Sequence, residues 1–101
     1  MSEQRTADRV PFVARIEAQA GGFPFIALAK NISVGGMLIN TANPVPEGQI
    51  VHLKFTLPGA NREIAVSGTV QHVTPGAYMG VRFQDLNPAD LEVIQRFVEA
   101  G

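Results

Sequence analysis

Residues 10–30 read VPFVARIEAQAGGFPFIALAK, and this stretch decides the fold. Its first half alternates with a period of two, as a half-buried strand does, and one face carries Val10, Phe12, Ala14, Ile16 and Ala18. Gly21 and Gly22 then supply the positive φ values that a tight hairpin turn requires. A second apolar stretch follows at once, so we expect two antiparallel strands, with Pro24 placing the start of the second strand at a sheet edge.

The same alternation continues downstream in four further segments that are separated by turn-rich sequence. Strands are predicted at residues 37–41, 49–57, 62–73 and 77–83. Gly68 lies in the middle of the longest segment, where it predicts a bulge or a sharp bend. His72 shares the alternation of Ile64, Val66 and Val70, which predicts a partly buried imidazole.

The C-terminal segment has a different period, and it predicts one amphipathic helix at about residues 87–100. Asn87 is a suitable N-cap and Pro88 suits the first helical position. Apolar residues recur at a spacing of three to four: Leu91, Ile94, Phe97 and Val98. Four acidic residues surround this segment and are interpreted as its solvated face: Asp85, Asp90, Glu92 and Glu99. The predicted fold is all-β with a C-terminal helix, an antiparallel barrel or sandwich over residues 10–101.

Composition limits the possible functions. The chain has 101 residues, enough for one domain, with 46% hydrophobic and 17% charged residues and a net charge of −1. This near neutrality argues against binding of long nucleic acids. Without cysteine, a signal-like N-terminus or a long apolar run, the sequence favours a cytoplasmic protein that does not insert into membranes.

Catalytic patterns are not found in the sequence. His52 and His72 fall within predicted strands and have no acidic partner nearby in sequence. Two histidines on different strands make a poor metal site, and no glycine-rich nucleotide loop occurs. We therefore expect a protein that is not an enzyme and that has neither a metal nor a cofactor.

Two polar features are not required by the fold. Arg5 and Arg9 lie four residues apart in the segment before the first strand, and guanidinium groups bind phosphate and the guanine edge as bidentate donors. The second feature, NISVGG at residues 31–36, combines an amide, a hydroxyl and two glycines. Taken singly, the first could be a solvated tail and the second an ordinary turn.

Taken together, RTADR at residues 5–9 and NISVGG at residues 31–36 resemble the RxxxR and [D/N]xSxxG signature of PilZ domains. The resemblance spans nearly the whole chain and implies a six-stranded antiparallel β-barrel of the split-barrel type. It also implies a bacterial receptor for cyclic di-GMP. The residues that it assigns to the ligand are Arg5, Arg9, Asn31, Ser33 and Gly36.

The family likeness implies a stand-alone receptor in which residues 1–9 form a flexible arm. This arm would become ordered over cyclic di-GMP and alter a surface that binds a downstream protein, in motility, biofilm formation or another process. A PilZ-like adaptor that binds protein without the ligand remains an alternative. A small barrel for single-stranded nucleic acid is a further alternative, but it would need exposed aromatic residues in a basic groove. Arg82 is interpreted as an exposed strand residue outside the site.

Overall fold

The computed structural model describes residues 9–42 and 45–100, which form six strands and one helix. The strands are β1 (Val10–Ala20), β2 (Phe23–Ile32), β3 (Gly36–Asn40), β4 (Ile50–Thr56), β5 (Glu63–Thr74) and β6 (Tyr78–Phe83). The helix is α1 (Pro88–Ala100). The predicted order of elements is therefore confirmed, with strand ends that differ from the predicted ones by up to two residues.

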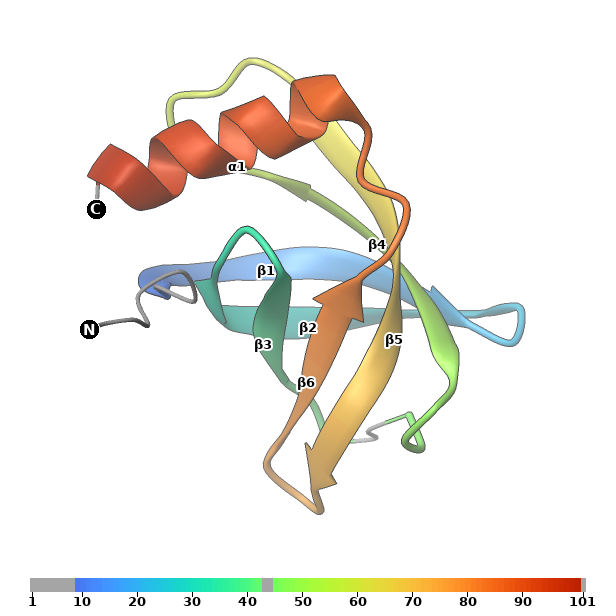
Figure 1. Ribbon diagram of the computed structural model, residues 1–101. Coiled ribbons are helices and arrows are strands. Elements are labelled where there is room, and N and C mark those ends of the chain that lie inside the picture. The colour runs from blue at the N-terminus through green and yellow to red at the C-terminus, as the bar shows by residue number, and fades with distance from the viewer. Residues whose placement is uncertain (1–8, 43–44, 101) are drawn as a thin grey trace, which may run out of the picture.

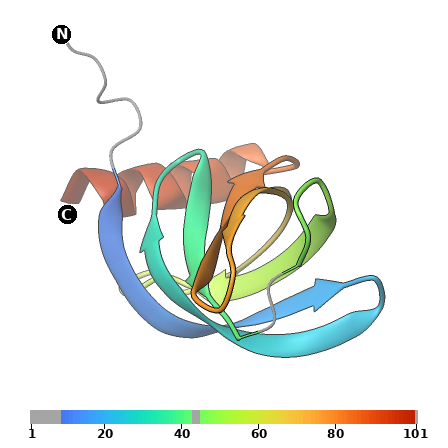
Figure 2. The ribbon, with the colours of Figure 1, turned by 90° about the horizontal axis from the view of Figure 1, so that it is seen from below.

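The strands close into an antiparallel barrel in the order β1-β2-β3-β6-β5-β4, and β4 pairs with β1 to complete the circle (Figures 1 and 2). The predicted six-stranded antiparallel barrel is confirmed. Apolar side chains on the inner faces fill its interior, as in other small barrels. The fully buried ones include Ile16, Ile39, Leu53, Ile64 and Met79.

The β1–β2 hairpin is the longest ladder in the barrel, and its turn has the predicted conformation. Gly21 has φ 58° and Gly22 has φ 83°, which are the values of a two-residue primed turn. β3 pairs with β2 only from Leu28 to Ile32. The outer edge of β2 near the hairpin tip is therefore not paired by β3, in agreement with the edge position predicted for Pro24.

Helix α1 lies across one end of the barrel and is joined to it by aromatic contacts (Figure 1). The ring of Phe97 meets Phe12 edge-on, with centroids 5.9 Å apart, and Phe12 also contacts Phe55. Ile94 is fully buried, which contributes about 2 to 3 kcal/mol of hydrophobic stabilisation. The helix therefore closes the core at that end of the barrel.

Asn87 caps α1 as predicted, because its Oδ1 accepts a hydrogen bond of 2.8 Å from the backbone N–H of Asp90. Asp90 itself does not belong to a solvated face, so that interpretation was wrong for this residue. Its side chain is buried, and one oxygen lies 2.9 Å from the Arg62 guanidinium. Among the described residues that oxygen has no aligned hydrogen-bond donor, so the contact is an ion pair. Arg62 precedes β5 and thereby ties the start of the helix to the sheet.

The bulge expected at Gly68 lies further along the strand, between Val70 and His72, where the β5–β6 register shifts. Gly68 stays in register with Val51, and its role is close packing, since a Cβ there would lie 2.4 Å from Val81 Cγ1. The bulge reverses the side-chain alternation beyond Val70. As a result His72 is exposed rather than partly buried as predicted.

Candidate ligand-binding site

The first contact of the site joins the two sequence features that the fold did not require. Arg9 precedes β1 and Asn31 lies near the end of β2, and the two strands pair antiparallel. This pairing allows the Arg9 Nη1 to donate a 3.0 Å hydrogen bond to Asn31 Oδ1, although the residues are 22 positions apart in sequence. The contact is exposed, and within the described residues it uses one of the five guanidinium N–H donors.

The loop after β2 is held by Ser33, which is buried. Its Oγ accepts hydrogen bonds of 3.2 Å from the backbone N–H groups of Gly35 and Gly36. Its own N–H donates to the Gly36 carbonyl at 2.8 Å, and the Gly35 carbonyl accepts from Phe83 N–H at 2.9 Å. Ser33 therefore fixes the conformation of the loop, in agreement with the ordinary turn that was one interpretation of this segment, and Gly35 attaches the loop to β6.

Gly36 is required by the packing of β3 against β6. Its φ does not lie in the left-handed region, so backbone conformation is not the reason for glycine here. A Cβ at this position would lie 2.2 Å from the Val81 carbonyl oxygen. Because that neighbour is backbone, only glycine fits without separating the two strands.

These elements form one wall of an open cleft of about 320 Å³ beside the β3–β6 ladder. The cleft brings together Arg9, Ser33 and Gly36, and it adds side chains that the sequence interpretation left out: Gln71, His72 and Arg82. Arg82 is exposed on β6, as predicted, and it also lines this cleft, so we include it in the candidate site. Asn31 contacts the cleft through Arg9, while Arg5 lies outside the described residues.

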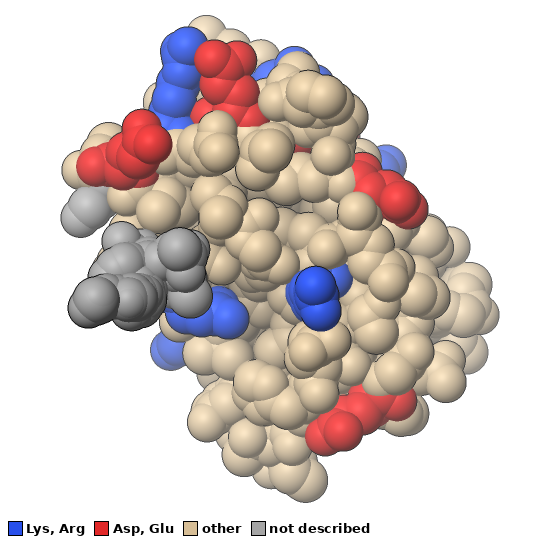
Figure 3. Space-filling model, in the orientation of Figure 1, with Lys and Arg blue, Asp and Glu red and all other residues tan. Residues whose placement is uncertain are grey.

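Charge in this cleft differs from that of the whole chain. Among the described residues, the lining contains two arginines and no carboxylate, although the net charge of the protein is −1. In the space-filling view, one blue side chain lies near the middle of this face and another beside the grey residues, while blue and red side chains lie close together at the helix (Figure 3). The cleft therefore offers a locally cationic surface that suits an anion.

His72 and Gly80 form the far wall of the cleft. They pair across β5 and β6, and the imidazole lies over Gly80, where an added Cβ would come within 2.5 Å of its Cε1. Tyr78 meets the ring edge-on, with centroids 6.4 Å apart. A flat ring is thus held at the cleft by a glycine beneath it and an aromatic beside it. The bulge that places His72 there leaves no simple signal in the sequence.

Other kinds of site were sought in the described part of the chain. Residues 9–42 and 45–100 contain no group of three histidine, cysteine, aspartate or glutamate side chains that could hold a metal. No helix there is long and apolar enough to cross a membrane. His52 contacts the Ser67 hydroxyl at 2.8 Å, but no described aspartate or glutamate bonds to this imidazole.

The described chain is thus a closed small barrel with an arginine-lined cleft on its outer surface. A family comparison is more specific: residues 3–100 match the PilZ domain model, and the chain belongs to the PilZ domain family. No protein of curated function matches the chain in sequence.

Solved structures share this fold at low sequence identity. Bacillus subtilis MotI/DgrA, an inhibitor of motility, matches with a TM-score of 0.86 and 18% identity over 98% of this chain. Borreliella burgdorferi PlzA, solved in complex with cyclic di-GMP, matches with a TM-score of 0.74 and 16% identity over 94%. The chain spans 51% of the first protein and 41% of the second. The PilZ domain of CeSA from a cellulose-synthesizing bacterium matches at 0.70 and 17% identity, with 91% of this chain and 95% of that chain covered.

Proposed function

We propose that this chain is a receptor for cyclic di-GMP, and that its output is a changed surface rather than a reaction. The observation that carries the proposal is the hydrogen bond between Arg9 and Asn31, which joins the two halves of the family signature on one cationic cleft. Family membership and the complex of PlzA with cyclic di-GMP support the choice of ligand.

The chemistry of the ligand fits the cleft. Cyclic di-GMP carries two phosphate charges and two guanine edges, and each guanine presents the O6 and N7 acceptors that an arginine fork reads. Arg9 is oriented by its hydrogen bond to Asn31, and its other N–H groups would donate to the ligand. Arg82 adds a second positive charge from β6. The His72 ring offers a flat surface against which a base can stack.

A cleft of about 320 Å³ is small for a ligand with two nucleotides, since pockets for drug-sized molecules span about 300 to 1,000 Å³. We propose that residues 1–8, with Arg5, cover the part of the ligand that extends beyond the cleft. Ordering this arm costs about 1 to 2 kcal/mol per residue, which several charge-assisted hydrogen bonds of about 1.5 to 3 kcal/mol each must offset. The ordered arm with its ligand is the new surface that a protein partner would bind.

Titration calorimetry with cyclic di-GMP tests the proposal, with GTP and cyclic di-AMP as competing nucleotides. We expect Arg5→Ala and Arg9→Ala to weaken binding by about tenfold or more and to leave the melting temperature nearly unchanged. Arg96→Ala is the matched control, because Arg96 is exposed on α1 and pairs only with Glu92 among the described residues. Absence of heat from the wild-type protein would favour the ligand-independent adaptor, and equal affinity of the two arm variants and the wild type would refute the assignment of the arm.

A further inference from the structure

The outer edge of β2 near the hairpin tip is an open strand edge. The turn at Gly21 and Gly22 makes Ala20 and Phe23 the closing pair, in which the N–H of Phe23 donates back to β1. In an antiparallel ladder the next residue points its backbone groups the other way. The backbone of Pro24 and Ile26 therefore faces away from β1, on the side where β3 pairs only from Leu28 onward.

This edge offers a short and specific set of hydrogen-bonding groups. Pro24 presents a carbonyl and has no N–H, and Ile26 presents both an N–H and a carbonyl. Between these residues and the segment that leaves β3 lies a groove of about 630 Å³. Its walls come from residues 23–28 on one side and from residues 40–42 with Val45 on the other.

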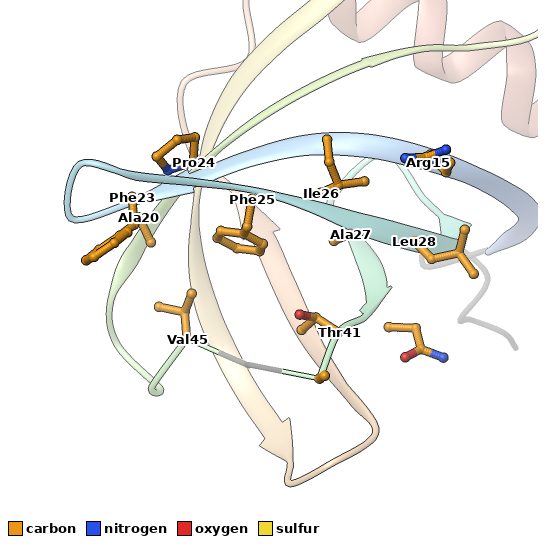
Figure 4. Close-up of a pocket in the computed structure, with 12 residues that line it drawn as sticks. Arg15, Ala20, Phe23, Pro24, Phe25, Ile26, Ala27, Leu28, Thr41 and Val45 are labelled. Carbon is orange, nitrogen blue, oxygen red and sulfur yellow. The ribbon is translucent and has the colours of Figure 1, made fainter.

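Large apolar side chains lie on both faces of this edge. Phe23 is 78% exposed and Ile26 is 55% exposed. Phe23, Phe25 and Val45 point into the space of the groove, while Pro24 and Ile26 lie on the opposite side of the hairpin (Figure 4). An unpaired edge with apolar groups on alternate sides has the features of a site that accepts an added strand.

We propose that the groove beside β2 binds an extended segment of a partner protein, which pairs with Pro24 and Ile26 as an added strand. Its side chains would alternate between the Phe23–Val45 side and the Ile26 side. Among the described residues that line the groove, Arg15 is the one that is ionisable, so a segment with one carboxylate and otherwise apolar, β-favouring residues fits best. This site is separate from the cationic cleft and does not depend on cyclic di-GMP.

The backbone groups favour a single strand over a second copy of this hairpin. Pro24 removes one donor from the edge, so two identical β2 edges facing each other would leave two carbonyls without a partner, whereas a single added strand would leave one. A linear peptide is therefore the appropriate probe.

A phage-displayed library of random linear dodecapeptides, selected on the full chain, tests the proposal. We expect the selected peptides to have alternating apolar residues and a carboxylate. Their synthetic forms should slow hydrogen exchange at the Ile26 amide. Of the two alternating N-methylation patterns of such a peptide, one should weaken binding by about tenfold or more and the other should not, because only one set of amides faces β2.

Protein variants locate the binding. Phe23→Ser and Ile26→Pro should each abolish peptide binding, whereas Val13→Ser, which replaces an apolar residue that is 67% exposed outside the groove, should not. Phe23→Ser keeps the test valid if Ile26→Pro fails to fold, since Phe23 is mostly exposed. The proposal is overturned if no peptide is enriched over the Phe23→Ser variant, or if both N-methylation patterns act alike. It is also overturned if the free protein forms a dimer that Phe23→Ser disrupts, because a second copy would then occupy the edge.

Discussion

Replacing Gly36 by alanine tests why the signature ends in glycine. At a strand position outside the left-handed region, Gly→Ala ordinarily stabilises a protein by about 0.4 to 1 kcal/mol, because it restricts the unfolded chain. Here the new Cβ would lie 2.2 Å from the Val81 carbonyl oxygen and 3.3 Å from the Arg82 Cα. Because both neighbours are backbone atoms, we expect the substitution to destabilise the protein.

The size of the effect follows from the separation that the strands would need. A carbon–oxygen contact needs more than about 3 Å, so β3 and β6 would have to move apart by roughly 1 Å at this point. That movement would break the 2.9 Å bond from Phe83 N–H to the Gly35 carbonyl and weaken the ladder beside it. Two or three bonds at about 0.5 to 1.5 kcal/mol each, with about 1 to 3 kcal/mol of overpacking, give a loss of about 2 to 7.5 kcal/mol.

Urea unfolding followed by circular dichroism measures this loss, which corresponds to a fall in melting temperature of about 10 °C or more. Gly35→Ala is the matched control, since its nearest neighbour would be Ser33 Oγ at 4.0 Å, and we expect it to change stability by less than about 0.5 kcal/mol. If Gly36→Ala unfolded at the same urea concentration as the wild type, the close approach of β3 and β6 would be disproved. Glycine at this position would then need a reason based on the ligand.

Three further outcomes are expected. Gly80→Ala would displace the His72 imidazole, because the new Cβ would lie 2.5 Å from its Cε1. We expect calorimetry to show cyclic di-GMP binding weakened about threefold to tenfold, at an unchanged melting temperature. Unchanged affinity would exclude His72 from the site. Asn31→Asp should tighten binding about fivefold by adding charge to the guanine contact, and weaker binding would show that residue 31 faces a phosphate. Arg62→Ala should lower the free energy of unfolding by about 1 to 3 kcal/mol, because it removes the cation beside the buried Asp90 carboxylate; an unchanged melting temperature would mean that solvent replaces Arg62 fully.

Local patterns in the sequence were sufficient for the elements of the fold. The period of two on each side of Gly21 and Gly22 predicted the β1–β2 hairpin, and the cap at Asn87 predicted the start of α1. Both features depend on residues that are neighbours in the chain. The two halves of the signature were also visible in sequence, but their contact through Arg9 and Asn31 follows only from the strand pairing.

The features that were missed depend on contacts between distant segments. The interpretation of Asp90 failed because its partner Arg62 comes from the start of another element. His72 was misplaced because a one-residue bulge in β5 reverses the side-chain alternation, and the alternation before the bulge gives no warning of it. Gly36 and Gly68 are required because neighbouring strands approach closely at these positions, and the sequence alone does not show that approach.

The local charge of the cleft, like these contacts, could not be predicted from the sequence, because it depends on where Arg9 and Arg82 lie in the fold. A net charge of −1 describes the whole chain, yet charges separated by more than about 8 Å are largely screened at physiological ionic strength. Two of the acidic residues of α1 are already paired, Asp90 with Arg62 and Glu92 with Arg96. In the part of the chain that the structure describes, the cleft lining has Arg9 and Arg82 and no carboxylate, so an anion there would meet two positive charges. On the proposed function, their two charges would match the two phosphates of cyclic di-GMP before Arg5 is counted, and the proposed arm would then act mainly in closing over the ligand and presenting it to a partner.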